Sequence, residues 1–397
     1  MLRQVEGSRA VAETVARCRP DVVAAYPISP QTHIVEALSD LVAEGRAGRC
    51  RFLMVESEFG AMSACIGASA AGGRAYTATA SQGLLFMAEA LPNASGLRLP
   101  IVMTVANRAL GAPINIWNDH SDALSQRDSG WLQLFASSNQ EAVDLHVQAF
   151  AIAERLSLPV MVCMDGFVLT HAMEEIDVPE QQEVDAFLPA FRPRQWLDPG
   201  QPVTIGAMVG PDAFTEVKYL MVQRQRLALD VVADVAADFW ATFCRDSGGL
   251  LRPYRTEDAE VVVVVMGSAW GTAADAVDRL REDGVRAGVL GVTCYRPWPS
   301  DAVRDALAGV RDVVVVNRAV AVGSGGVLGR DVRLSAPAGT VVREVVMGLG
   351  GRPVTCAGFV QLIGDVLDGW EPTGVLDFRD LDREVAAREL AREQATS

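Results

Sequence analysis

Short apolar runs alternate with helical patterns between residues 8 and 164 of the chain. The expected strands are residues 21–26, 51–56, 75–80, 101–106 and 159–164, and the expected helices are residues 8–18, 31–42, 81–97 and 140–156, with a further helix that begins at Glu58. The strands are almost continuously apolar, which is typical of strands buried on both faces. Strands of this kind, separated by helices, predict a parallel sheet covered by helices on both sides.

The pattern changes after residue 179. A connector rich in proline and acidic residues covers 179–202, one long helix is expected at 214–243, and a polar linker covers 246–258. A second alternating pattern follows, with strands at 261–267, 285–293 and 312–317 and helices at 270–283, 300–308 and about 358–367. We therefore predict an α/β protein with a first domain of residues 1–245, a second of residues 246–370 and a charged tail of residues 371–397.

A glycine-rich segment, residues 323–329, follows the expected strand 312–317 and raises the alternative of dinucleotide binding. Leu328 stands where the third glycine of a GxGxxG pattern would be, and the segment lies late in its unit. We therefore interpret it as a tight backbone turn.

Composition excludes several classes of partner. The 397 residues carry a formal net charge of −15, which argues against binding to nucleic acid or to an anionic membrane surface. Apolar runs are too short for a membrane span, and the first ten residues have no signal-peptide core. Half of the residues are hydrophobic, so large buried cores are expected.

The cysteines and histidines are dispersed. The seven cysteines contain no CxxC pair, which argues against an iron–sulfur or structural zinc site in this chain. An odd, scattered set fits the reducing cytoplasm. The four histidines are scattered as well, so no metal site is predicted.

Candidate chemistry lies at the carboxyl ends of the expected strands, where open α/β sheets bind ligands. These positions hold Ser29, Glu58, Ser81, Gln82, Asn107 and Arg108. Each residue by itself could be there only because its side chain suits a turn. Their convergence at one edge of the sheet favours a ligand-binding site. Glu58 opens a helix whose small residues leave space for a flat ligand or another chain.

Five long segments carry a resemblance to a known family. They are YPISPQTHIVEAL (26–38), VESEFGAMSACIGASAAG (55–72), TATASQGLLFMAEAL (77–91), ANRALGAPINIWNDHSDALSQRDSGW (106–131) and NRAVAVGSGGVLG (317–329). Together they resemble the alpha subunit of pyruvate:ferredoxin oxidoreductase and, more broadly, the thiamine-dependent 2-oxoacid:ferredoxin oxidoreductases. The resemblance implies a parallel-sheet domain that binds the pyrimidine of thiamine diphosphate, followed by a transketolase-C-terminal-like α/β domain.

The resemblance also implies an assembly. A partner beta subunit would bind the diphosphate and magnesium, and gamma and ferredoxin-like delta subunits would complete the complex. The [4Fe-4S] clusters would lie on these partners, with coenzyme A as co-substrate and ferredoxin as electron acceptor. The chain itself lacks the GDG motif of a diphosphate–magnesium site, which excludes a transketolase-like enzyme acting alone.

Roles for single residues follow from the same resemblance. Glu58 matches the catalytic glutamate that hydrogen-bonds N1′ of the aminopyrimidine, and Ser81 and Gln82 lie in a matching cofactor-binding segment. Arg108 matches the arginine that holds the 2-oxoacid carboxylate, a task suited to its planar fork. Ser29 stands where the family commonly has threonine, so it keeps the hydroxyl but loses the methyl group.

Three alternatives stay open at this stage. The substrate could be 2-oxoisovalerate, 2-oxoglutarate, oxalate or an arylpyruvate instead of pyruvate. The chain could be a non-catalytic scaffold subunit, although Glu58 and Arg108 argue against that. Arg108 could also be a surface residue paired with Asp119, Asp122 or Asp128 of the following loop.

Overall fold

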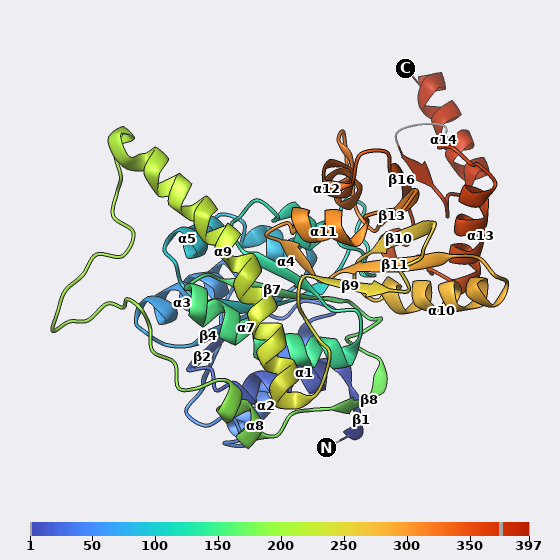
Figure 1. Cartoon of the computed structure of the whole chain (residues 1–397). Coiled ribbons are helices and arrows are strands. Elements are labelled where there is room, and N and C mark those ends of the chain that lie inside the picture. The colour runs from blue at the N-terminus through green and yellow to red at the C-terminus, as the bar shows by residue number, and fades with distance from the viewer. Residues whose placement is uncertain (1, 373–375, 397) are drawn as a thin grey trace.

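The computed structural model describes residues 2–372 and 376–396, which form two α/β units (Figure 1). The first unit is built on a seven-stranded sheet of order β12-β6-β7-β5-β4-β2-β3, in which β12 alone is antiparallel to its neighbour. Its strands are β2 (Val22–Ala25), β3 (Arg51–Met54), β4 (Ala75–Thr79), β5 (Ile101–Asn107), β6 (Leu132–Phe135), β7 (Val160–Asp165) and β12 (Cys294–Arg296). The parallel sheet expected for this part of the chain is confirmed.

Two hydrophobic cores cover the two faces of this sheet. Alternate residues of a strand point to opposite faces, so Val102 joins one core while Met103 joins the other. The helices of the first unit are α1 (Gly7–Arg17), α2 (Thr32–Ala43), α3 (Glu58–Ala70), α4 (Ser81–Phe86), α5 (Ala90–Gly96), α6 (Ser121–Ser125) and α7 (Asn139–Leu156). Helices α1, α2 and α7 pack on one face, and α3, α4 and α5 on the other.

The second unit has a six-stranded sheet of order β17-β16-β13-β10-β11-β9, parallel except for β9. Its strands are β9 (Leu251–Tyr254), β10 (Val261–Val265), β11 (Ala287–Val292), β13 (Asp312–Asn317), β16 (Val341–Val346) and β17 (Asp377–Phe378). Its helices are α10 (Ala269–Glu282), α11 (Ser300–Ala306), α12 (Val327–Ser335) and α13 (Cys356–Leu367), with a 3₁₀ turn at Leu349–Gly351. In the tail, α14 (Arg383–Thr396) projects from this unit (Figure 1).

The two units share structure. Strand β12 leaves the second unit and pairs with β6 of the first sheet. One hydrophobic core also runs across the junction, joining Met103 and Phe135 to Val262 and Leu290. A separate two-stranded sheet pairs β1 (Leu2–Glu6) with β8 (Met173–Asp177). The boundary near residue 245 stays a prediction.

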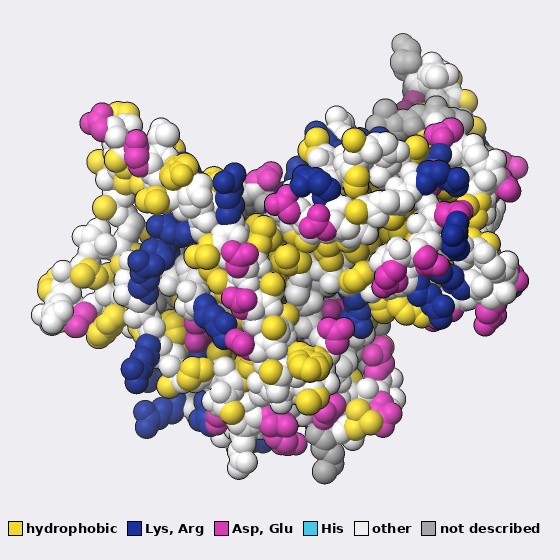
Figure 2. Space-filling model, viewed as in Figure 1, with side chains coloured by type: hydrophobic (Ala, Val, Ile, Leu, Met, Phe, Trp, Pro, Cys, Tyr) yellow, Lys and Arg dark blue, Asp and Glu magenta, His cyan; other side chains and the backbone are white. Residues whose placement is uncertain are grey.

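Two helices follow β8 in the connecting region. Helix α8 (Gln181–Phe187) lies in the connector, and α9 (Pro211–Phe243) is the long helix expected from the sequence. The carboxyl-terminal half of α9 packs on α7 through Ala228, Val232, Val235 and Phe239. Its amino-terminal half projects from the body (Figure 1) and displays hydrophobic side chains (Figure 2), which include Phe214, Val217, Tyr219, Leu220 and Val222.

Several expected elements differ in the structure. The helix expected at 81–97 is broken into α4 and α5, because Pro92 cannot donate a backbone hydrogen bond to the preceding turn. The linker at 246–258 contains β9. Strands β1, β6, β8 and β16 and helices α6 and α8 were not predicted. The glycine-rich segment forms a hairpin of β14 (Val320–Ala321) and β15 (Gly325–Gly326) before α12, with Gly323 and Gly325 at positive φ.

Candidate active site

The predicted site residues follow the carboxyl ends of four neighbouring strands, β3, β2, β4 and β5. Glu58 opens α3 after β3, and Ser29 follows β2. Ser81 and Gln82 open α4 after β4, and Arg108 directly follows β5. Since these strands are parallel, their carboxyl ends lie at one edge of the sheet, as expected from the sequence.

Glu58 is held by the start of α3. Ser57 caps this helix, because its hydroxyl accepts a hydrogen bond from Gly60 N, 3.1 Å away. The Glu58 side chain is 7% exposed and makes no hydrogen bond or ion pair with the described residues. A buried carboxylate without a partner is costly in a folded protein, so Glu58 is poised to accept a hydrogen bond from a ligand.

Small side chains shape the space around Glu58. A Cβ atom at Gly83 would lie 2.6 Å from Glu58 Oε1 and 2.5 Å from Thr79 Oγ1. The Thr79 hydroxyl is buried, and within the described chain it has no hydrogen-bond partner. Gly83 therefore lets α4 approach the carboxylate. Neighbouring Glu56 is exposed and lies against Gly60, which separates it from the Glu58 position.

Arg108 and Ser29 are brought together. Arg108 Nη1 donates to the Ser29 carbonyl oxygen at 2.9 Å, and Nε donates to the Asn115 carbonyl oxygen at 3.0 Å. The side chain is 7% exposed, and burial lowers the pKa of Arg108. Its guanidinium forms no ion pair within the described residues, so the alternative of a surface pair with Asp119, Asp122 or Asp128 is wrong. The donors of Nη2 stay available for a carboxylate.

Ser81 and Gln82 have different environments. Ser81 is fully buried at a φ of 47°, and its hydroxyl lies 2.6 Å from the Ala109 carbonyl oxygen, to which it donates. The same hydroxyl lies 2.5 Å from Gln82 Oε1, which leaves Ser81 little capacity to bind a ligand directly. Gln82 is exposed. Ser81 therefore positions Gln82 and the loop after β5.

Asp122 is the residue at this edge that sequence reasoning missed. Its carboxylate accepts hydrogen bonds from Ser81 N, Arg108 N, Ala123 N and Asn107 Nδ2, all at 2.7–2.9 Å. One carboxylate thus fixes the turns that carry Ser81 and Arg108. Burial raises the pKa of Asp122 to about 7, although the four N–H donors oppose the rise. An aspartate inside a loop of many polar residues gives no sequence signal for such a role.

A second buried network joins the carboxyl edges of the two sheets. Asp165, at the end of β7, contacts Arg318 Nη1 at 2.5 Å and His120 Nε2 at 2.8 Å. Ser268 donates to the same carboxylate through its backbone N at 2.9 Å and through its hydroxyl. Burial raises the pKa of Asp165, but the charges of Arg318 and His120 outweigh burial and hold it well below its ordinary value.

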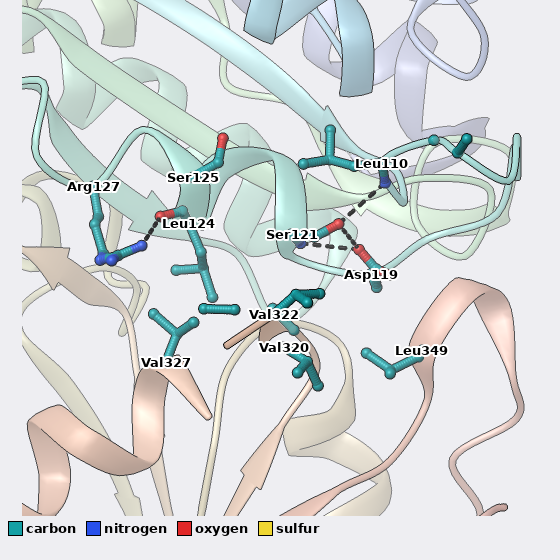
Figure 3. Close-up of a pocket in the computed structure, with 14 residues that line it drawn as sticks. Leu110, Asp119, Ser121, Leu124, Ser125, Arg127, Val320, Val322, Val327 and Leu349 are labelled. Carbon is teal, nitrogen blue, oxygen red and sulfur yellow. Dashed lines mark hydrogen bonds between the residues drawn. The ribbon is translucent and has the colours of Figure 1, made fainter. Parts of the chain in front are cut away.

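A cavity of about 650 Å³ lies beside this junction (Figure 3). It is lined by the loop after β5, including Leu110, Asp119 and Ser121, and by Val320 and Val327 of the second unit. The Ser121 hydroxyl joins two parts of this loop. It donates a hydrogen bond to Asp119 Oδ1 at 2.5 Å and accepts one from Leu110 N at 3.2 Å. Glu58 and Arg108 do not line this cavity, but its lining residue Gly111 lies beside Gln82.

Comparisons with known proteins give a consistent result. Residues 13–236 match the family model for the thiamine diphosphate-binding part of pyruvate flavodoxin/ferredoxin oxidoreductase, and residues 259–359 match pyruvate:ferredoxin oxidoreductase core domain II. The chain is 47% identical to pyruvate synthase subunit PorA of Methanosarcina barkeri, over 90% of this chain and 91% of that protein. It is 38% identical to ketoisovalerate oxidoreductase subunit VorA of Pyrococcus abyssi, over 98% of both.

Two solved structures have similar folds. A 2-oxoglutarate:ferredoxin oxidoreductase from Magnetococcus marinus superposes with a TM-score of 0.71 at 19% identity, and the match covers 92% of this chain but only 65% of that longer chain. A split-gene transketolase, an inactive beta4 tetramer, gives a TM-score of 0.55 at 16% identity, with 92% of this chain and 99% of that chain covered. At these identities the likeness shows the fold alone, and the predicted fold class is confirmed.

Proposed function

Since the chain belongs to the pyruvate:ferredoxin oxidoreductase family, we propose that it supplies one half of a shared thiamine diphosphate site. In this proposal it is the alpha subunit of a complex that converts pyruvate and coenzyme A to acetyl-CoA and carbon dioxide. The two electrons removed from pyruvate pass to ferredoxin. The observation that carries the proposal is the buried, unpartnered carboxylate of Glu58 at the sheet edge.

The surroundings of Glu58 fit the aminopyrimidine half of the cofactor. The carboxylate has free acceptor capacity, and Gly83 gives access where a larger side chain would collide with it. Phe59 and Phe86 are exposed nearby, with ring centroids 6.4 Å apart, and offer apolar surface for a flat ring. Thiamine diphosphate supplies the carbon nucleophile that attacks 2-oxoacids, and Glu58 would exchange a proton at N1′ of its pyrimidine.

The chain does not fit the other half of the cofactor. Its sequence has no GDG motif, and the only described group of histidine, cysteine or acidic ligands close enough for a metal ion lies elsewhere, at Glu6, His33 and His171. In the proposal, magnesium and the diphosphate are therefore held by a beta subunit. The iron–sulfur clusters belong to beta or delta-type subunits, and a gamma subunit completes the complex.

Exposed apolar side chains around the half-site support a subunit contact. Leu53 and Met54 of edge strand β3 are exposed, as are Leu85 and Phe86 of α4. Exposed apolar patches of this kind are typical of protein interfaces. Within the described part of the chain, no helix is both long and apolar enough to cross a membrane.

Arg108 and Ser29 are proposed to hold the 2-oxoacid. The available guanidinium donors of Arg108 would bind the substrate carboxylate, and the exposed Ser29 hydroxyl would donate to it. A second candidate substrate is 2-oxoisovalerate, favoured by the similarity to a ketoisovalerate oxidoreductase subunit over nearly the whole chain. A screen of 2-oxoacids with the reconstituted complex, coenzyme A and ferredoxin would decide between the two.

The test of the half-site is Glu58→Gln in the reconstituted complex. Glutamine keeps the size of the side chain but removes proton exchange, so turnover should fall by roughly 10²–10⁴-fold. Glu56→Gln is the matched control, because Glu56 is exposed two positions away and should leave turnover unchanged. Loss of less than a few-fold in Glu58→Gln would show that the carboxylate only starts a helix, or that the subunit is a scaffold.

A binding measurement tests the sharing of the site. The chain without partners should bind thiamine diphosphate only weakly in calorimetry, because the proposed charge and metal anchors lie on the partner. Micromolar, magnesium-dependent binding by the chain alone would contradict the half-site.

A further inference from the structure

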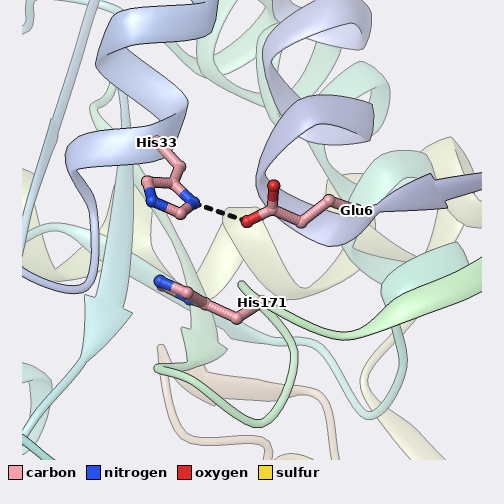
Figure 4. A group of neighbouring side chains, drawn as sticks. All are labelled: Glu6, His33 and His171. Carbon is pink, nitrogen blue, oxygen red and sulfur yellow. Dashed lines mark hydrogen bonds and ion pairs between the residues drawn. The ribbon is translucent and has the colours of Figure 1, made fainter.

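Three potential metal ligands meet on the surface beside α2, and Glu58 is not among them. They are Glu6 at the end of β1, His33 in the first turn of α2, and His171 in the loop between β7 and β8 (Figure 4). One ligand atom from each residue lies within 4.8 Å of the other two. The sequence predicted no metal site because its histidines are scattered, but folding brings two of the four side by side.

The backbone at all three positions is fixed. Glu6 is paired with Met173 in the β1–β8 ladder, and Ser8 N donates to the Thr170 carbonyl oxygen at 2.9 Å. His33 is held by α2, which packs against α1 in one hydrophobic core. Ligands on rigid elements lose little freedom when an ion binds, so the arrangement is preorganised.

Hydrogen bonds orient the two imidazole rings of the cluster. His33 Nδ1 lies 2.6 Å from Glu6 Oε1, so a nitrogen and a carboxylate oxygen already face one another. His171 Nδ1 lies 2.7 Å from the Thr170 hydroxyl oxygen. A ligating histidine commonly has its second ring nitrogen in a hydrogen bond. The Thr170 bond occupies Nδ1, so Nε2 of His171 is the atom that would bind the ion.

We propose that Glu6, His33 and His171 form a binding site for a divalent first-row transition metal ion, with zinc as the reference ion. Two imidazoles and one carboxylate suit this class of ion better than magnesium or calcium, which prefer oxygen ligands. The imidazole centroids lie 4.5 Å apart, and the side chains are only partly buried. They can therefore rotate to ligand distances of about 2.0–2.2 Å, with water completing the coordination shell.

An ion at this site would tie together segments that lie close to the proposed substrate-binding residues. The ring of Phe167 lies against that of His171, with centroids 4.7 Å apart and planes tilted by 38°. It also lies against Trp117, at 4.8 Å and 48°, in the loop whose Asn115 accepts a hydrogen bond from Arg108. Ser29 lies four residues before His33 in the sequence, just before α2 begins. An ion would therefore clamp the start of α2 to the loop after β7, next to both proposed substrate-binding residues. The metal site itself does not depend on the proposed function.

The test uses the full chain, stripped of metal by a chelator and titrated with zinc by calorimetry. We expect one site with a dissociation constant on the order of micromolar. The variants His33→Gln and His171→Gln should each weaken binding at least ten-fold. The double variant keeps buried His120 and His146, so it also tests whether other histidines bind the ion. Circular dichroism checks that every variant is folded.

Two comparisons make the assignment specific. Glu6→Gln should weaken zinc binding, whereas Glu36→Gln should not, because Glu36 is exposed on the same helix as His33 but lies outside the cluster. Cobalt should give the visible absorption of nitrogen and oxygen ligation. The site would be overturned by a thiolate charge-transfer band with cobalt or by equal effects of both glutamate variants. It would also be overturned by unchanged binding in the double histidine variant, or by no zinc binding at millimolar concentration.

Discussion

Arg108 illustrates how a single residue combines a structural and a chemical requirement. Two of its nitrogens hold the Ser29 and Asn115 carbonyl oxygens, which fixes the guanidinium plane without a carboxylate partner. A buried guanidinium that is held in place but not neutralised favours an anionic ligand. The proposed ligand is the carboxylate of the 2-oxoacid.

We predict that Arg108→Lys lowers kcat/KM for the 2-oxoacid by roughly 10–100-fold in the reconstituted complex. Lysine keeps the charge but loses the fork, and a charge-assisted hydrogen bond is worth about 1.5–3 kcal/mol. Steady-state kinetics with pyruvate measures the loss. The control is an aldehyde analogue that lacks the carboxylate, for which the change should be small. Equal losses for both compounds would mean that Arg108 does not bind the carboxylate.

The sequence predicted which residues stand at the sheet edge, but not how they are held there. Glu58, Ser29 and Arg108 follow strands with clear apolar patterns, so their positions follow from the strand assignment. Asp122 lies in the short helix α6, which was not predicted, and its four hydrogen bonds depend on a fold that brings three separate backbone segments together. Ser81 was expected to contact the cofactor, and its buried, bonded hydroxyl favours a positioning role instead.

Among the elements, those with long periodic patterns were predicted well. Helices α7 and α9 lie within a few residues of their expected bounds, because each presents a continuous pattern over many turns, and α3 begins at Glu58 as expected. Short strands were missed. Strand β6 has four residues, and β12 has three that pair with a sheet of the other unit, a partnership that no local pattern encodes.

Helix α7 is an element buried on nearly all sides, and it carries a histidine in its interior. His146 Nδ1 lies 2.6 Å from the Ala142 carbonyl oxygen, and Nε2 lies 2.5 Å from Thr104 Oγ1. The Thr104 hydroxyl in turn lies 2.6 Å from the Tyr76 hydroxyl. This chain of bonds suits a neutral imidazole that donates from Nδ1 and accepts at Nε2. Burial lowers the pKa of His146 to about 4, although the Ala142 bond opposes the decrease.

We predict that this histidine makes the chain less stable in acid. The unfolded chain takes up a proton at His146 near pH 6.5, whereas the folded chain does so only near pH 4, so protonation favours unfolding between these values. The contribution should reach about 3 kcal/mol by pH 4, since each unit of pKa difference corresponds to about 1.4 kcal/mol. Urea unfolding from pH 7.5 to 4 measures it.

The control for this prediction is His146→Leu, which cannot titrate. Its unfolding free energy should be lower at pH 7 but should depend less on pH than that of the unchanged chain. If the two pH profiles ran parallel, the acid sensitivity would come from other groups.

At the scale of the whole molecule, the carboxyl edges of the two sheets meet. Asp165 ends a strand of the first sheet, and Arg318 and Ser268 follow strands of the second. The shared core and the exchange of β12 join the same two units. A buried ion pair, a shared apolar core and an exchanged strand therefore all help to fix the arrangement of the units. None of the three could be predicted from the separate patterns of the two halves.

We expect Arg318→Met to lower the free energy of unfolding by about 3–5 kcal/mol at pH 7, because it removes the arginine charge that pairs with the buried carboxylate of Asp165. The matched control is Arg286→Met, which breaks an ion pair with Glu260 on the surface and should leave stability nearly unchanged.

The sign of the pH dependence of this stability difference is a further check. The depressed pKa of Asp165 stabilises the fold above about pH 4, and this stabilisation is lost as the pH falls further. Protonation also relieves the unpaired carboxylate in the variant, so the difference between the two chains should shrink in acid. A difference that stayed constant from pH 7 to pH 3 would show that Arg318 stabilises the junction by packing and not by its charge.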